Sequence, residues 1–504
     1  MSLRKKPYLA LLSACVCSIA LAQPGDYGDG IAAFAPSVLL ENKDGRFNHW
    51  NGIGRMESME NRMCTAVLID TRTDTNVDAP AYVLSSGHCT YVQPGQAATD
   101  LEIEGHVEFN YFKDIPPGKR PVYPLKKIHW SSMRGVDLAL LELQAPLSRL
   151  LEDGITPMKL SGTAAQTGSE VLSVSAPLAP NGHTLRLSAC EVDAVVNIIE
   201  HPYAWNANLR NRCEDVLPGS SGSPLIDRHT NTIIGIMGTG TRGATEQSRC
   251  FADSPCEVSD GKATWSADTT YASPIDVLHA CFVEGVFERS LPTCRLQTDA
   301  RVTLPNPSYQ KHMIRLERDA QGAVIAPRWD MKFTINTSQF KFKTTRNPSQ
   351  CREPDGYRSS RDARTAHINS VIGTEPGLYS LCIVGHNGNE GDLPGVRENA
   401  FIHSVELVDS GTTPAPAVTV TQLDTGKYHV AFTRSLPTHA SHAFKFGAPD
   451  STDCADPKGY KTVYYNFNIS PRLLPATLCT VAKDASGQAS EPRVDSLVAP
   501  KNDN

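Results

Sequence analysis

Cysteines constrain the fold of this 504-residue chain more than any other feature of its sequence. Twelve of the fourteen lie beyond residue 22, where they follow one another in six couples. In an exported protein an even set of this kind indicates disulfides. No Cys-x-x-Cys pair has a matching partner, so we expect no zinc or other metal site. The sequence alone does not determine the connectivity, but we expect chain neighbours to pair: Cys64 with Cys89, Cys190 with Cys213, Cys250 with Cys256, Cys281 with Cys294, Cys351 with Cys382, and Cys454 with Cys479.

The first 22 residues have the composition of a secretion signal. Basic residues 4–6 precede an apolar run at 8–21, and Ala20-Leu21-Ala22 forms a small-residue cleavage site. Residues 12–15 also resemble a lipoprotein signal, but the apolar run continues past Cys15, so we prefer export without a lipid anchor. No later segment has the roughly 18 apolar residues that span a membrane. We therefore expect a secreted protein, extracellular or periplasmic.

Length and composition limit the class of protein. A chain of this length suggests about three domains. Its content of 40% hydrophobic and 20% charged residues is ordinary for soluble globular proteins. The formal net charge of −6 provides no basic field, which argues against nucleic acid as a partner.

The segment Pro218-Gly219-Ser220-Ser221-Gly222-Ser223-Pro224 consists of small residues between two prolines. Glycine and proline disfavour a helix, and serine competes for backbone hydrogen bonds, so we predict a tight loop. Such a loop can expose one hydroxyl and several backbone N–H groups, as an acyl-transfer nucleophile requires. A serine–glycine turn without a function would have the same composition. The interpretation therefore depends on a base and an orienting acid elsewhere in the chain.

Two residues have the context that a base and an acid would need. His88 follows the apolar strand pattern at 81–84 and precedes Cys89. Asp137 opens the apolar run 138–143, where a carboxylate is costly without a hydrogen-bond donor. A histidine Nδ1–H would supply that donor and would be oriented by it. Taken singly, a structural histidine and a turn aspartate would explain each residue equally well.

Together, His88, Asp137 and Ser221 resemble the trypsin/chymotrypsin family of serine endopeptidases, in residue order and in local sequence. The resemblance covers about residues 50–290, roughly half of the chain. The serine motif is similar to that of secreted bacterial members, lysyl endopeptidases among them. The family's fold, two six-stranded antiparallel β-barrels with the site in the cleft between them, is what the resemblance implies.

The resemblance also implies a role for each residue. Ser221 would attack the scissile carbonyl, His88 would move the proton, and Asp137 would hold the imidazole tautomer. No cofactor is needed, and the partner would be a protein or peptide substrate. The oxyanion hole would consist of the N–H groups of Gly219 and Ser221, and the segment that pairs with the substrate backbone would be Gly238, Thr239 and Gly240.

Four residues depart from the family pattern. Ser220 replaces the aspartate that pairs with the new N-terminus of activated trypsin, and no Ile-Val-Gly-Gly start is present, so we do not expect that mode of activation. Ser86-Gly87 stands where Ala-Ala is usual, a mild change. Leu217 replaces the family's usual cysteine two residues before the oxyanion glycine, which indicates a differently built pocket.

The residue preference of the pocket has two interpretations. Asp215 lies six residues before Ser221, the offset of the acidic pocket base in trypsin, and would there neutralise a Lys or Arg side chain. Alternatively, Asp215 caps the loop and the pocket accepts acidic residues, with Thr239 nearby. The sequence leaves both open.

An internal repeat with a period of about 103 residues begins near Cys294. The motifs between 340 and 382 recur between 444 and 479, each with one cysteine couple. Each unit has short alternating strands and the size of an immunoglobulin-like sandwich. These units would dock on a surface or a substrate, or serve as a spacer or removable extension.

We therefore predict an all-β chain: a trypsin-like double β-barrel followed by two immunoglobulin-like β-sandwich repeats. The segments are a signal peptide at 1–22, an N-terminal arm or propeptide at 23–50, the protease domain at 51–293, and repeats at 294–410 and 411–504. Arg55 and Arg62 are candidate processing sites. The alternative function is a catalytically inactive, protease-like adhesion or binding protein, which the intact contexts of the three motif residues disfavour.

Overall fold

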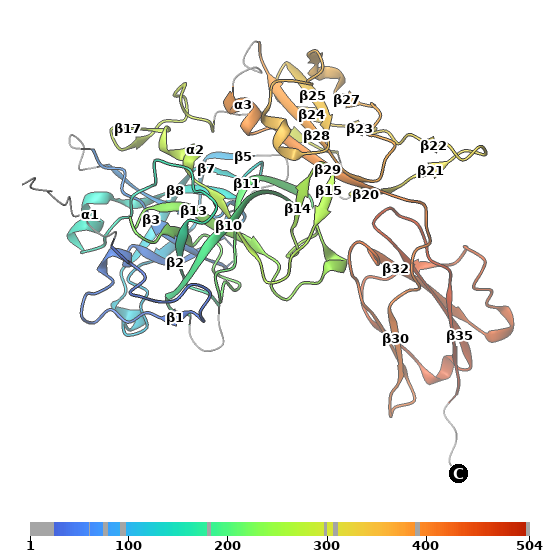
Figure 1. Cartoon of the computed structure of the whole chain (residues 1–504). Coiled ribbons are helices and arrows are strands. Elements are labelled where there is room, and N and C mark those ends of the chain that lie inside the picture. The colour runs from blue at the N-terminus through green and yellow to red at the C-terminus, as the bar shows by residue number, and fades with distance from the viewer. Residues whose placement is uncertain are drawn as a thin grey trace, which may run out of the picture.

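The computed structural model describes residues 25–59, 61–73, 79–90, 97–178, 183–296, 300–305, 311–388 and 394–499. The predicted signal peptide and Cys15 lie outside these residues. Nearly all regular structure in the described chain is β-strand (Figure 1). Its α-helices are short: α1 (Leu147–Glu152), α2 (Asp276–His279) and α3 (Pro394–Glu398). Within the described residues, no helix is long and apolar enough to cross a membrane.

Six antiparallel strands close the first barrel. They pair in the order β7-β6-β2-β3-β4-β8, and β8 returns to β7. Closure removes the free sheet edges and gives the apolar side chains a common interior. A further strand, β5 (Ala97–Glu102), pairs with β7 outside the ring. The ring consists of β2 (Ile53–Ser58), β3 (Arg62–Leu68), β4 (Pro80–Ser85), β6 (Gly105–Glu108), β7 (Val122–Ser132) and β8 (Leu138–Pro146).

A second ring of six antiparallel strands follows. Its order is β11-β16-β13-β12-β9-β10, with β10 closing onto β11. The two closed rings agree with the double barrel that the family resemblance implies. The strands are β9 (Glu170–Ser175), β10 (Arg186–Glu200), β11 (Tyr203–Asn211), β12 (Pro224–Asp227), β13 (Ile233–Gly240) and β16 (Thr270–Pro274). Outside the ring, β14 (Cys256–Ser259) pairs with β10, and β15 (Lys262–Thr264) pairs with β14.

The described part of the predicted N-terminal arm is bound to the second barrel. Its strand β1 (Val38–Leu39) pairs with β10. Asp26 forms an ion pair with Arg228 at 2.8 Å, and the indole of Trp50 donates to Asn231 at the same distance. Backbone pairing, an ion pair and a buried ring therefore all attach the arm to this barrel.

The C-terminal half contains two β units. The first has a five-stranded sheet in the order β20-β29-β28-β25-β26, flanked by short strand pairs. The second has a three-stranded sheet, β30-β31-β34, and a four-stranded sheet, β33-β32-β35-β36. The immunoglobulin-like assignment and the domain boundaries stay predictions.

The strands of the first unit's main sheet are β20 (Met313–Arg315), β25 (Gln339–Thr345), β26 (Arg361–Asp362), β28 (Gly377–His386) and β29 (Phe401–Val408). Those of the second unit are β30 (Val418–Gln422), β31 (Tyr428–Phe432), β32 (Ser441–Gly447), β33 (Lys461–Thr462), β34 (Phe467–Ile469), β35 (Ala476–Lys483) and β36 (Arg493–Leu497).

The same local cluster occurs in both units. Lys343 pairs in register with Cys382, and its ammonium lies 4.4 Å from the ring of Tyr357. In the second unit Lys445 pairs with Cys479 and lies 4.7 Å from the ring of Tyr460. The tyrosine hydroxyl donates to the carbonyl of the first cysteine in each unit, at 2.7 Å and 2.8 Å. The motifs that recur in the sequence therefore build equivalent contacts.

The six disulfides join the couples that were expected from chain proximity: Cys64–Cys89, Cys190–Cys213, Cys250–Cys256, Cys281–Cys294, Cys351–Cys382 and Cys454–Cys479. Each closes a short stretch of chain, so none ties one predicted domain to a distant one.

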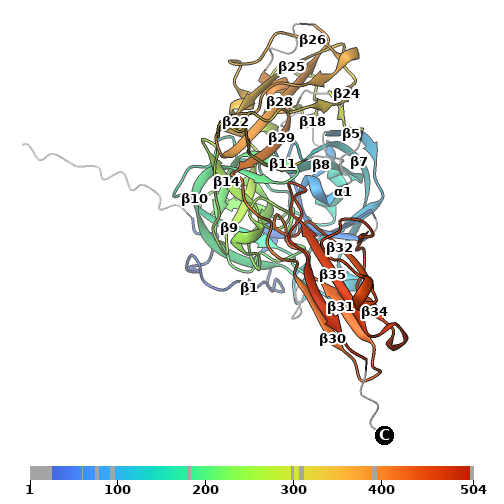
Figure 2. The ribbon, with the colours of Figure 1, turned by 90° about the vertical axis from the view of Figure 1, so that its right-hand side faces the viewer.

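The first C-terminal unit packs directly on the second barrel. Ile199 and Ala204 of the barrel share an apolar cluster with Leu378 and Val384 of β28. The second unit lies to one side of the barrels in Figure 1 and extends below them in Figure 2. The two units are linked by Arg315, whose guanidinium pairs with the buried Asp484 at 2.8 Å.

Three histidine rings lie next to one another at the contact between the second barrel and the first unit, the first two of them stacked. The ring centroids of His201 and His312 are 4.3 Å apart, and those of His312 and His403 are 5.3 Å apart. Burial lowers the pKa of all three, and that of His403 falls to about 3. The rings are therefore neutral at pH 7.

This cluster should make stability depend on pH. An unfolded histidine has a pKa of about 6.5, so the unfolded chain gains protons before the fold does as pH falls below that value. We expect the Tm to fall between pH 7 and pH 5, and His403→Phe, which keeps a ring against Trp329, to reduce that fall. Scanning calorimetry at both pH values measures the effect, and an equal fall in the variant would contradict this account.

Candidate active site

A cavity of about 920 Å³ lies between the two barrels. His88 and Arg62 line it from the first barrel, and Ser221, Thr239 and Glu200 line it from the second. His88, Ser221 and Thr239, which belong to predicted motifs far apart in the sequence, thus all line this cavity.

His88 and Asp137 form a hydrogen-bonded pair at the base of this cavity. His88 lies in the 3₁₀ turn Gly87–Cys89, directly after β4. Its Nδ1 is 2.7 Å from Asp137 Oδ2, and its backbone N–H donates to Asp137 Oδ1 at 2.9 Å. Because Asp137 is only 1% exposed, its carboxylate depends on these donors. This is the orientation that the sequence predicted for the two residues.

The environment of His88 raises its pKa. Burial acts to lower the pKa, but the charge and hydrogen bond of Asp137 outweigh burial, so the pKa lies above that of an ordinary histidine. Nδ1 faces the carboxylate, which leaves Nε2 as the ring atom available for proton exchange.

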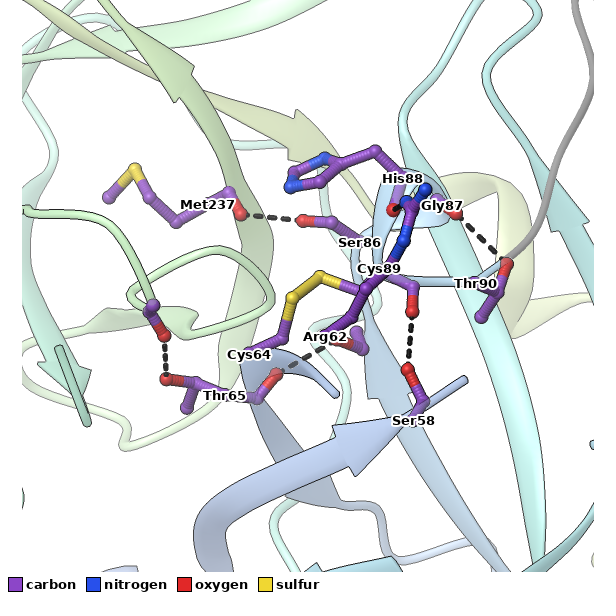
Figure 3. Close-up of a disulfide and its surroundings, with 12 residues drawn as sticks. Ser58, Arg62, Cys64, Thr65, Ser86, Gly87, His88, Cys89, Thr90 and Met237 are labelled. Atoms are coloured by element: carbon purple, nitrogen blue, oxygen red, sulfur yellow. Dashed lines mark hydrogen bonds between the residues drawn. A yellow bond between two sulfur atoms is a disulfide. The ribbon is translucent and has the colours of Figure 1, made fainter. Parts of the chain in front are cut away.

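A disulfide on one side of His88 and a side-chain hydrogen bond on the other fix this turn (Figure 3). Cys64 of β3 bonds to Cys89, next to His88. Ser86 Oγ donates to the carbonyl of Met237 in the second barrel at 2.7 Å, a contact that the family's usual alanine could not make. Arg62 donates to the carbonyl of His88 at 2.5 Å. The two sulfur atoms beside His88 are bonded to each other, so they offer no thiolate ligands to a metal.

Residues 218–223 form a loop, as their composition predicted. Gly222 has a φ of +86°, and a Cβ there would lie 2.1 Å from the carbonyl oxygen of Thr65. Thr65 N donates to the carbonyl of Ser221 at 2.8 Å, and Thr65 Oγ1 donates to that of Gly219 at 2.9 Å. Strand β3 therefore holds the loop that carries Ser221, which lies partly exposed at the cavity.

The backbone N–H groups of this loop divide into two sets. Those of Ser220, Gly222 and Ser223 donate to carbonyls of Leu217, Met237 and Ser220. Among the hydrogen bonds of the described residues, none uses the N–H of Gly219 or of Ser221. These are the two groups expected to form an oxyanion hole, and both residues line the cavity.

Gly238, Thr239 and Gly240 end strand β13 at the cavity wall. A Cβ at Gly238 would lie 2.9 Å from Asp137 Oδ2, so glycine is what lets the strand approach the carboxylate. Thr239 Oγ1 donates to Glu200 at 2.6 Å. The predicted substrate-pairing segment therefore borders the predicted triad.

Asp215 does not lie where a pocket base would have to be. It is absent from the cavity lining, although its neighbours from Val216 to Gly219 are part of it. Its φ is +57°. Its carboxylate accepts from the N–H of Ser37 at 3.1 Å and from the hydroxyl at 2.7 Å, and Arg242 lies 3.6 Å away. Asp215 thus holds the N-terminal arm, and the geometry does not support the predicted contact with a substrate side chain.

Glu200 is the acidic residue that sequence reasoning missed. It ends β10 and lines the cavity. Burial raises its pKa to about 7, while hydrogen bonds from Thr239 and Asp253 act against the rise. Glu200 follows an apolar strand in the sequence, and no local motif signals its contact with Thr239, which comes from another strand of the barrel.

A family-model match bears on this arrangement. Residues 64–236 match the family model of the trypsin-like peptidase domain. No curated protein matches the chain in sequence. Similar solved structures include protease Anisep from Arthrobacter nicotinovorans (16% identity, TM-score 0.30, 45% of this chain and 91% of that one) and a Glu endopeptidase (13% identity, TM-score 0.31, 48% and 93%). The match does not select the lysyl subtype. Residues 64–236 of the chain thus form a trypsin-like peptidase domain.

Proposed function

We propose that the chain is a serine endopeptidase that hydrolyses peptide bonds through an acyl-enzyme, with Ser221 as nucleophile, His88 as general base and Asp137 as the orienting acid. The observation that carries the proposal is the hydrogen bond between His88 and the buried Asp137, together with the position of His88 and Ser221 in the lining of one cavity. The histidine has a raised pKa, as a base beside a carboxylate should.

The proposed chemistry follows from these positions. Ser221 Oγ attacks the scissile carbonyl carbon while its proton passes to His88 Nε2, and Nδ1–H stays bonded to Asp137. The carbonyl oxygen gains negative charge and is bound by the N–H groups of Gly219 and Ser221. Collapse of this intermediate breaks the C–N bond, and the leaving amine takes the proton from Nε2. Water then repeats the sequence on the ester and releases the acid.

The end of β13 is the proposed docking edge for the substrate. Gly238 and Gly240 carry no side chain, so an extended peptide can approach their backbone groups and add as a further strand. Pairing of this kind would hold the scissile carbonyl next to the Ser221 loop, because the loop and the strand line one cavity.

Export is also part of the proposal. Six disulfides suit an oxidising compartment, and residues 1–22 have a signal composition. The two sheets of the last unit support the proposed sandwich, and we assign both C-terminal units to attachment on a surface or substrate. An inactive binding protein of the same family is the alternative function.

Mapping of cut sites tests the function. In a mixed peptide library, we expect the wild-type protein to produce cuts that Ser221→Ala loses, with turnover falling about 10⁶-fold and the Tm unchanged. Asp137→Asn should lose about 10⁴-fold, because the histidine tautomer is no longer held. Mass spectrometry reads the cuts.

The same experiment decides the alternatives. Cuts that persist in Ser221→Ala would contradict the mechanism, and no cuts by either protein would favour the binding-protein alternative. Cuts after Lys or Arg that disappear in Asp215→Asn would restore Asp215 as the pocket base, against its present contacts with Ser37.

The pH dependence of the rate tests the His88–Asp137 pair. His88 must be neutral to accept a proton, so kcat/KM for an uncharged substrate should fall as pH drops through its raised pKa. Gly238→Ala would displace the Asp137 carboxylate, so His88 would lose its hydrogen-bond partner. The acid limb of the profile of kcat/KM against pH should then move to lower pH, and kcat should fall. Gly118→Ala is the control, because a Cβ there meets no described atom within 4 Å. An unmoved acid limb in Gly238→Ala would show that the pair does not set the pKa.

A further inference from the structure

Glu200 is an anchored carboxylate in the wall of the cleft. Its Oε2 accepts from Thr239 Oγ1 at 2.6 Å, and its Oε1 accepts from the backbone N–H of Asp253 at 2.9 Å. Donors on two different segments therefore hold both oxygens in place. The side chain lines the cavity together with His88 and Ser221.

Two aromatic residues lie close to this carboxylate, because Glu200 pairs in register with Tyr203. The rings of Tyr203 and Trp205, on the strand that follows Glu200, are stacked with their centroids 5.8 Å apart and an interplanar angle of 6°. The indole N–H of Trp205 donates to the carbonyl of Met133 at 2.9 Å, which fixes its orientation. Both rings line the cavity. A carboxylate next to aromatic faces matches the alkyl stem and charged head of Lys or Arg.

Within the described chain no ion pair holds Glu200 in its charged form, and burial raises its pKa to about 7. Of the cationic residues at the cavity, Arg242 pairs with Glu214 at 2.8 Å, and Arg62 is bonded to the carbonyl of His88. The neighbouring His201 is neutral, because burial lowers its pKa well below the usual value. A substrate cation would offset the cost of this half-buried charge.

The position of Thr239 indicates which part of a substrate Glu200 would meet. The Cα of Gly238 faces Asp137, and Thr239 turns toward Glu200. A peptide paired with residues 238–240 would place residues upstream of the scissile bond along this edge, on the side of Glu200 and His88.

We propose that Glu200 selects substrates with Lys or Arg upstream of the residue at the scissile bond, at one of the positions P2 to P4. This rests on the proposed endopeptidase function. Glu200 acts as a specificity residue by forming an ion pair with the substrate side chain. The partly exposed ring of Tyr203 contacts the stem of that side chain, and Trp205, which is only 2% exposed, supports Tyr203 by stacking on it.

Pairs of peptides that differ only in arginine or citrulline at P2, P3 or P4 test the proposal, because citrulline has the same shape without the charge. We expect the wild-type kcat/KM to favour arginine by about tenfold at one of these positions, the size of one charged contact. Glu200→Gln, which keeps an acceptor for Thr239, should bring the ratio to about one. Glu214→Gln removes an equal charge at Arg242 and should preserve the arginine preference.

The outcomes separate the two proposals. If no peptide is cleaved, the endopeptidase function fails and this inference fails with it. If peptides are cleaved without an arginine preference at P2 to P4, or if the preference survives Glu200→Gln, only the role of Glu200 is overturned. Calorimetric binding of the arginine peptide to Ser221→Ala, with and without Glu200→Gln, gives the same comparison without turnover: equal affinities would overturn the role.

Discussion

The buried carboxylate of Asp137 is the constraint on which the rest of the site depends. An ionised group with 1% exposure is stable only if its oxygens are hydrogen-bonded, and His88 supplies a bond to each oxygen. The backbone of the histidine turn and that of β13 both approach this carboxylate closely, which requires residues without a side chain at the points of approach. A Cβ at Gly87 would lie 2.1 Å from the carbonyl oxygen of Ser132, and one at Gly238 would lie 2.9 Å from the carboxylate. Glycine at both positions follows from this geometry.

Two adjacent residues of β3 couple the histidine turn to the serine loop. Cys64 is bonded to Cys89, beside His88, and Thr65 donates twice to the loop of Ser221. Ser86 adds a bond from the histidine turn to the second barrel. The relative position of base and nucleophile is thus set by one strand of the first barrel, and a shift of β3 would move both loops together.

Much of this organisation could be predicted from local patterns in the sequence. Each disulfide joins chain neighbours, so proximity in sequence was a sufficient guide to the pairing. The loop at Ser221, the strand end before His88 and the strand start after Asp137 are short-range features, and the family resemblance supplied the double barrel. Long-range contacts were not predictable in this way. Asp215 is held by Ser37, 178 residues away, and Glu200 meets Thr239, 39 residues away, and neither pair has a local signature.

Capture of the covalent intermediate tests the central claim most directly. An activated ester substrate, mixed with the protein and quenched with acid within the first turnover, should leave one acyl group per molecule on the peptide that contains Ser221. The same treatment of Ser221→Ala should leave that peptide unmodified. The account predicts a stoichiometric burst and this single labelled residue. Turnover of the ester with no acyl group on Ser221, or with the group on another residue, would contradict it.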